Sequence, residues 1–165
     1  MNRNLSSKYF SSKQEKMIAN SLGWDVVSGS GSRNLHPGDI QSDEWLGECK
    51  THEKPGHKII FYKSVWDKIV DEAISKYRFP ALFVDDGSQK IENTWVMFNV
   101  LPAINYTSCS FIYTVKTNVS FKSLDMMKHR NTFDLSEPVV YTLKYYRHNV
   151  YVSTLQDFIT MFGSN

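Results

Sequence analysis

Three charged side chains close together in the sequence could hold a metal ion and activate a water molecule. Segment 37–50 predicts a β-hairpin with a polar turn over residues 41–44. Because side chains alternate between the two faces of a strand, Glu48 and Lys50 share a face, and Asp39 on the partner strand can bring its carboxylate beside Glu48. Two carboxylates are hard oxygen ligands that suit Mg²⁺ or Mn²⁺. The Lys50 ammonium could then orient or help deprotonate an attacking water, or offset negative charge that develops on a phosphate. A solvated turn with a cross-strand ion pair would use the same residues.

The order of these residues resembles a known motif. Pro37-Gly38-Asp39 followed by Glu48-Cys49-Lys50 resembles the PD-(D/E)XK nuclease motif, and the Ser-Gly-Ser loop before it is similar to that of archaeal-type Holliday junction resolvases. The resemblance implies that Asp39 and Glu48 bind the metal, that the backbone carbonyl of Cys49 completes the site, and that Lys50 serves the water. Gly38, which separates the proline from the aspartate, departs from the motif in a way that the superfamily tolerates.

The resemblance also implies a fold. It covers about residues 12–100 and predicts an α/β protein with a restriction-endonuclease-like core, in which a mixed central β-sheet is flanked by helices. Residues 101–165 are expected to form an α+β C-terminal extension that completes a single domain over 1–165. A loop serine of the family maps best onto Ser30, with Ser32 as the alternate.

Glu15 has two possible roles. The first helix is expected over about residues 13–22, ended by Gly23, and it looks about one turn short for the family. In the resembling family an acid on this helix reaches the metal site, and Glu15 is the candidate. Ser12-x-x-Glu15 also spells a capping box, in which the carboxylate returns to the backbone N–H of Ser12. The sequence leaves both readings open.

The segments on either side of the hairpin carry groups that suit phosphate. Loop 28–36 supplies hydroxyl groups, glycine N–H groups, Arg33 and His36, although a Gly/Ser run is also an ordinary flexible connector. After Lys50, a polar loop with His52 and His57 leads to three lysines. These lysines predict a local DNA-contacting patch, or equally a solvated charge run: Lys54, Lys58 and Lys63.

The remaining pattern predicts the supporting elements. A strand is expected over 24–27 with Val26 buried, a buried central strand over 81–84, an ordinary Asp-Gly turn over 85–88 and a strand over 94–100. Between them a helix begins near Ser64, with an inward face of Val65, Trp66, Ile69, Val70, Ala73, Ile74 and Tyr77. Farther on we expect a strand over 110–115, a helix over 120–129, a hairpin of 139–146 with 150–152, and a final helix through Phe162 capped by Ser153 or Thr154.

Composition narrows the classes of function. The 165 residues carry a net charge of +2, so a purely electrostatic DNA binder is disfavoured and any nucleic-acid surface must be a local patch. The two cysteines, Cys49 and Cys109, predict reduced thiols rather than a disulfide framework. No apolar leader or membrane-length run is present, so a cytoplasmic protein without a membrane partner is expected.

Together these features predict an Mg²⁺-dependent DNA endonuclease, with Mn²⁺ able to substitute. By resemblance, the expected substrate is a branched or four-way DNA junction and the expected assembly is a homodimer, because a junction presents two symmetry-related cuts. Two alternatives stay open. One is a restriction- or phage-type nuclease acting on duplex DNA, and the other is a catalytically silent DNA-binding module on the same scaffold.

Overall fold

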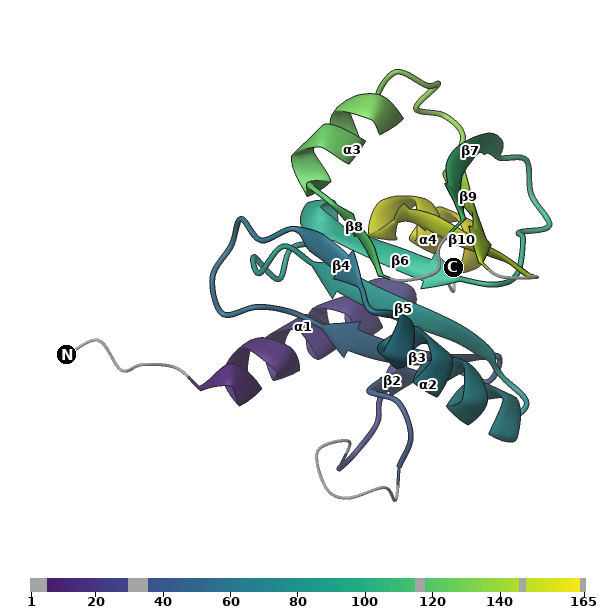
Figure 1. Ribbon diagram of the computed structural model, residues 1–165. Helices are drawn as coiled ribbons and strands as arrows, with labels where there is room; N and C mark the ends of the chain where they lie inside the picture. Colours follow the sequence, from purple (N-terminus) through teal and green to yellow (C-terminus); the bar gives the residue numbers. More distant parts are fainter. Residues whose placement is uncertain (1–5, 30–35, 115–117, 146–147, 164–165) are drawn as a thin grey trace.

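The structure, a computed structural model, describes residues 6–29, 36–114, 118–145 and 148–163 (Figure 1). The helices and strands follow one another along the chain in this order: α1 (Ser7–Leu22), β1 (Asp25–Val26), β2 (Ile40–Gln41), β3 (Trp45–Lys50), β4 (Ile59–Phe61), α2 (Lys63–Ser75), β5 (Phe79–Asp85), the 3-10 helix η1 (Ile91–Asn93), β6 (Thr94–Phe98), β7 (Thr107–Thr114), β8 (Val119–Phe121), α3 (Ser123–Arg130), β9 (Val139–Tyr145), β10 (His148–Thr154) and α4 (Leu155–Phe162). In this part of the chain, no helix has both the length and the apolar character needed to cross a membrane.

Eight strands form one mixed sheet in the order β1-β2-β3-β5-β6-β10-β9-β7, and β4 pairs with β8 in a second, two-stranded sheet. The β3–β5 and β7–β9 pairs are parallel, and the other pairs of the large sheet are antiparallel. The expectation of a mixed sheet flanked by helices is therefore confirmed. The C-terminal strands extend this same sheet, because β10 pairs directly with β6.

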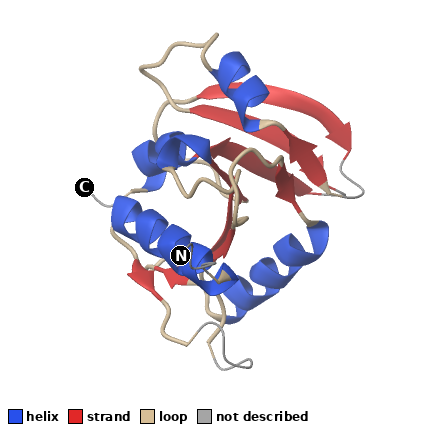
Figure 2. Ribbon diagram, turned by 90° about the vertical axis from the view of Figure 1, so that its left-hand side faces the viewer, coloured by secondary structure: helices blue, strands red, loops and turns tan. Residues whose placement is uncertain are grey.

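Helices cover both faces of the large sheet (Figure 2). On one face, buried residues of α1 and α4 pack against β3, β5 and β6. On the other face, α2, α3 and the β4–β8 pair cover a second apolar cluster. Burial on both faces explains why residues 81–84 of β5 form a continuous apolar run, as the sequence predicted.

Aromatic rings fix β3 from the face that carries α1 and α4. Trp45 stacks on Trp24 with ring centroids 6.0 Å apart and meets Phe158 of α4 edge-on at 5.2 Å. Phe158 also meets Phe83 of β5 at 5.7 Å. Each such pair contributes roughly 0.5–1.5 kcal/mol to stability beyond the burial of apolar area, so this cluster holds β3 firmly in place.

The first helix begins earlier than expected. It starts at Ser7 rather than near residue 13, and its N-cap is Ser6. Few apolar residues mark its first turns, which is why hydrophobic periodicity did not predict them. The expectation that this helix is a turn short was therefore wrong, while Gly23 ends it in the left-handed conformation as predicted.

Three predictions of burial were wrong. Val26 is 40% exposed, since its short strand β1 lies at the edge of the sheet. Ile74 and Tyr77 are 65% and 97% exposed. The second helix ends at Ser75, and Tyr77 then turns the chain with a φ of 56°, so the helical spacing does not continue to it.

Some boundaries in the second half also differ. The third helix begins at Ser123, because residues 119–121 pair with β4 as a strand. His148 and Asn149 belong to β10 rather than to the predicted hairpin turn. The final helix is capped as predicted by Thr154, whose Oγ1 accepts a hydrogen bond from the N–H of Asp157 at 3.0 Å.

Candidate active site

Asp39 and Glu48 face each other across the predicted hairpin. Strands β2 and β3 are antiparallel, with Ile40 opposite Gly47, and the N–H of Asp39 donates to the Gly47 carbonyl at 2.8 Å. Continuing this register by one residue places Asp39 opposite Glu48. Cβ atoms of directly opposed residues lie about 4.5–5.5 Å apart, so the two carboxyl groups share one face.

Gly38 makes this approach possible. Its φ of 76° lies in the left-handed region, and a Cβ atom there would lie 2.7 Å from Cδ1 of Leu46. A residue with a side chain would therefore be strained and would collide with β3. The glycine that interrupts the motif is the residue that lets the chain enter β2 with Asp39 in position.

Lys50 and Glu48 form a close ion pair on this face. The Lys50 Nζ atom lies 2.5 Å from Oε1 of Glu48, and the Glu48 side chain is 9% exposed whereas that of Lys50 is 46% exposed. Burial lowers the pKa of Lys50, but the hydrogen bond and charge of Glu48, with a contribution from Asp39, outweigh it and raise the pKa overall. Lys50 therefore keeps its proton. It is suited to orient a water or to offset charge, and poorly suited to accept a proton.

Asp39 is held in a partly buried and electrostatically unfavourable position. Burial, followed by the negative charge of Glu48, raises its pKa to about 6, and the N–H of Cys49 opposes that rise by donating to Oδ2 at 2.8 Å. A site that concentrates negative charge in this way favours a cation. The hydrogen bond from the Cys49 N–H thus fixes the orientation of the Asp39 carboxyl group.

Glu15 belongs to this site electrostatically. Burial raises its pKa first and the charge of Glu48 raises it further, while Lys50 lowers it. The capping-box reading is wrong, because Ser12 lies inside α1 and the N-cap Ser6 makes no side-chain cap bond. The charges of Glu48 and Lys50 therefore act on the Glu15 carboxyl from the end of β3.

Cys49 points away from this face. Its side chain is 6% exposed within the apolar cluster beneath α1, and burial raises the pKa of its thiol. The thiol is therefore a core group and not a ligand. The assignment of its backbone carbonyl to the metal remains a prediction.

Gln14 was missed by the sequence reasoning. Its side chain is fully buried and its Nε2 donates to the Lys50 carbonyl at 2.8 Å, which ties α1 to the end of β3. Its Oε1 has no hydrogen-bond partner among the described residues. The signal that could have revealed it is spacing, since Gln14, Ile18 and Leu22 recur every four residues and place an amide on the inward stripe of the helix.

A buried polar network fixes the chain just after Lys50. Thr51 Oγ1 donates to Asp85 Oδ1 at 2.5 Å, and Gln89 Nε2 donates to Thr51 Oγ1 and to the His52 carbonyl, each at 2.9 Å. Asp85 also accepts the N–H of Gly87 at 2.8 Å, as the predicted turn chemistry requires. Burial is the main cause that raises the pKa of Asp85. The network joins the ends of β3 and β5 and so fixes the backbone that follows Lys50.

The predicted phosphate-contacting residues are distributed unevenly. Ser30, Ser32 and Arg33 lie outside the described residues, so their predicted role stays a prediction. His36 is exposed and lines a cavity beside Pro37.

Lys54 and Lys58 are exposed in the loop after β3, where the rings of His52 and His57 stack with centroids 4.0 Å apart. Lys63 instead starts α2 and pairs with Asp67 one helical turn later. Its charge is therefore partly balanced, and Lys54 and Lys58 are the more available cations of this set.

The donors suit a cation such as Mg²⁺. Within the described residues, no three His, Cys, Asp or Glu side chains gather into a group able to hold a metal alone. Mg²⁺ needs no such cage, since it keeps several waters and uses one or two carboxylates together with substrate phosphates. The adjacent carboxyl groups of Asp39 and Glu48, with the pKa of Asp39 raised by its neighbour, match that requirement.

Comparison with known proteins adds no further constraint. No family model matches the chain, and no curated protein or solved structure is significantly similar to it. The assignment of the site therefore depends on the hairpin motif and on the geometry described above.

Proposed function

We propose that this protein is a metal-dependent endonuclease that hydrolyses phosphodiester bonds in DNA. The observation that carries the proposal is the arrangement at the end of β3, where Asp39 lies opposite Glu48 and Lys50 pairs with Glu48 at 2.5 Å. Two carboxylates and a protonated lysine on one face form a compact set for phosphate chemistry, supported by Glu15 from a separate helix.

Each residue has a defined role in this proposal. Asp39 and Glu48, with the Cys49 carbonyl, would hold Mg²⁺. When bound, the ion polarises the scissile phosphate and lowers the pKa of a bound water. Lys50 keeps the proton on Nζ, so it orients the attacking water and offsets the charge that develops on the phosphate oxygens. Glu15 would orient a second cation, or a water molecule bound to the first Mg²⁺.

The substrate class follows from the motif resemblance. Four-way DNA junctions are the proposed substrate, and a two-fold homodimer would place two such sites for paired cuts. Linear duplex DNA is the substrate expected of a restriction- or phage-type enzyme that uses the same residues.

Cleavage of matched DNA substrates tests the proposal. Linear, forked and four-way DNA built from the same sequences would be incubated with the protein in Mg²⁺ or in EDTA, and the products resolved on denaturing gels. We expect Mg²⁺-dependent nicks near the junction centre. Equal cutting of the linear duplex would favour the restriction-type reading, and DNA binding with no cleavage of any substrate would favour the silent module.

A further inference from the structure

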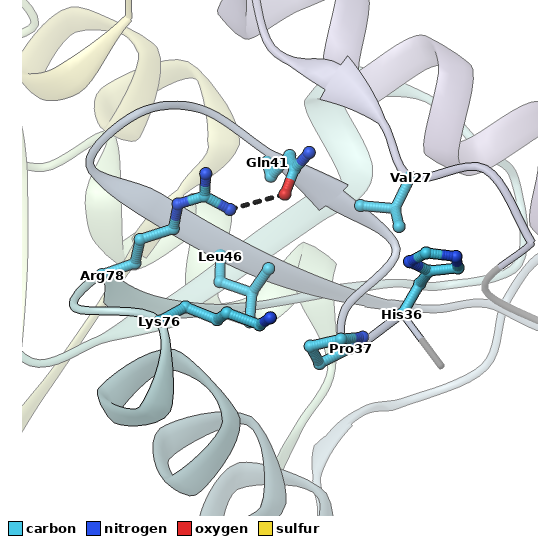
Figure 3. Close-up of a pocket in the computed structure, with 7 residues that line it drawn as sticks. All are labelled: Val27, His36, Pro37, Gln41, Leu46, Lys76 and Arg78. Carbon is cyan, nitrogen blue, oxygen red and sulfur yellow. Dashed lines mark hydrogen bonds between the residues drawn. The ribbon is translucent and has the colours of Figure 1, made fainter. Parts of the chain in front are cut away.

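A separate cavity lies beside the start of β3 (Figure 3). Its volume is about 260 Å³. This is below the range of roughly 300–1,000 Å³ that drug-sized ligands occupy, so it would take one small group. Apolar side chains and polar groups share the lining: Val27, His36, Pro37, Gln41, Leu46, Lys76 and Arg78.

The cavity is positively charged. Lys76 and Arg78 contribute two cations, and none of the described residues that line it is acidic. Figure 3 shows the Lys76 side chain extending beneath Leu46 toward Pro37, and the Arg78 guanidinium directed at Gln41. Arg78 Nη1 donates to Gln41 Oε1 at 2.5 Å, and within the described part of the chain neither cation pairs with a carboxylate.

The chain turn after α2 leaves both cationic side chains available. The backbone N–H groups of Lys76 and Arg78 donate to the Ala73 carbonyl at 3.0 and 2.9 Å, and that of Tyr77 donates to the Ile74 carbonyl. These backbone bonds already satisfy the Ala73 and Ile74 carbonyls near the end of the helix. The ammonium and guanidinium groups are therefore not needed as helix caps and can contact a ligand.

The cavity lies on the same face of the hairpin as the candidate active site. Leu46, which lines it, precedes Glu48 by two residues and alternates onto the same face of β3. Two residues of a strand span about 7 Å, a distance within reach of a neighbouring phosphate on the same DNA strand. A DNA strand with its scissile phosphate at Glu48 would thus bring a flanking phosphate to Lys76 and Arg78.

We infer that this cavity binds a backbone phosphate of the DNA strand that flanks the hydrolysed bond, and this inference rests on the proposed function. The guanidinium of Arg78 supplies paired N–H donors that match phosphate oxygens, and Lys76 supplies a point charge. The apolar walls at Val27 and Leu46 face the sugar. The cavity fixes the register of the strand relative to the cut.

Salt dependence of DNA binding tests the inference without cleavage. Fluorescence anisotropy of a fluorescein-labelled four-way junction would be measured in EDTA for the wild type, Lys76→Ala and the double variant with Arg78→Ala. Each lost phosphate contact flattens the slope of log Kobs against log salt by about 0.9. Because Lys76 and Arg78 share one phosphate, we expect the double variant to flatten the slope by about 0.9 and Lys76→Ala to flatten it by part of that amount. Lys128→Ala, an exposed lysine of α3, is the charge-matched control and should leave the slope unchanged.

The outcomes separate this inference from the proposed function. Flattened salt slopes in the variants support the inference that the cavity binds a DNA phosphate, even if the wild type shows no cleavage. If the wild type cleaves DNA and Lys76→Ala leaves the salt slope unchanged, the inference about the cavity is overturned and the proposed nuclease function is not. Absence of any DNA binding by the wild type would also overturn the inference. Lys76 is exposed, so that variant should fold. Calorimetry with inorganic phosphate gives a further outcome. If Lys76→Ala weakens phosphate binding but does not change the salt slope of DNA binding, the cavity binds free phosphate and the inference is contradicted.

Discussion

Asp39→Asn should make the metal-free protein more stable at high pH. Asparagine has nearly the same shape as aspartate, and its side-chain oxygen can still accept the hydrogen bond from the Cys49 N–H that Asp39 accepts at 2.8 Å. The substitution therefore removes the charge and retains the contact. It isolates the cost of burying an ionised carboxylate beside Glu48.

The size and the sign of the effect follow from the pKa of Asp39. Folding raises that pKa from its ordinary value of 3.8 to about 6, so the folded state binds the proton more tightly than the unfolded state. The stability from this proton is fully present below about pH 4 and is lost as the pH rises through about 6. About two pKa units correspond to about 3 kcal/mol. Asp39→Asn should thus match the wild type at pH 4 and exceed its free energy of unfolding by about 3 kcal/mol at pH 8.

Urea denaturation in EDTA across this pH range measures the difference. Asp71→Asn, an exposed aspartate of α2, is the matched control and should stay within about 0.5 kcal/mol of the wild type at both ends. The reasoning would be refuted if Asp39→Asn were no more stable than the wild type at pH 8. Adding Mg²⁺ should then stabilise the wild type and not the variant, because the ion binds the folded carboxylate.

Three further variants probe the rest of the account. Glu15→Gln should leave the free energy of unfolding near that of the wild type and lower the cleavage rate about 10–100-fold, whereas a loss of stability with normal cleavage would return the residue to a structural role. Gly47→Ala should destabilise the protein by about 1–3 kcal/mol in urea, because a Cβ there would lie 2.9 Å from Phe83, and an unchanged denaturation midpoint would contradict this packing. Arg130→Met should cost about 3–5 kcal/mol by leaving Asp157 buried without its partner at 2.7 Å, and a difference below about 1 kcal/mol would show that the ion pair is dispensable.

The hairpin could be predicted from sequence because its signals are local. Alternation along residues 45–50 places Glu48 and Lys50 on one face, and the structure confirms this with their ion pair. The continuous apolar run of β5 is also a local signal, and it predicts a strand that is buried on both faces. Short-range periodicity decides these features, and the tertiary structure agrees with it.

The support for the site depends on contacts between distant segments. Gln14 reaches the Lys50 carbonyl across 36 positions of the chain, and Gln89 reaches Thr51 across 38. The strand order, with β10 beside β6, also brings distant segments together. A single sequence carries no record of such pairings, so Gln14 appeared to be one polar residue among many.

Lys50 is the residue whose removal should separate DNA binding from cleavage. Single-turnover cleavage and equilibrium DNA binding would be measured for the wild type, Lys50→Ala and the control Lys128→Ala, in Mg²⁺ for cleavage and in EDTA for binding. We expect Lys50→Ala to bind DNA within a few-fold of the wild type and to lose cleavage by at least about 100-fold, because the ammonium group acts on transition-state charge. Cleavage by Lys50→Ala at the rate of the wild type would contradict the account.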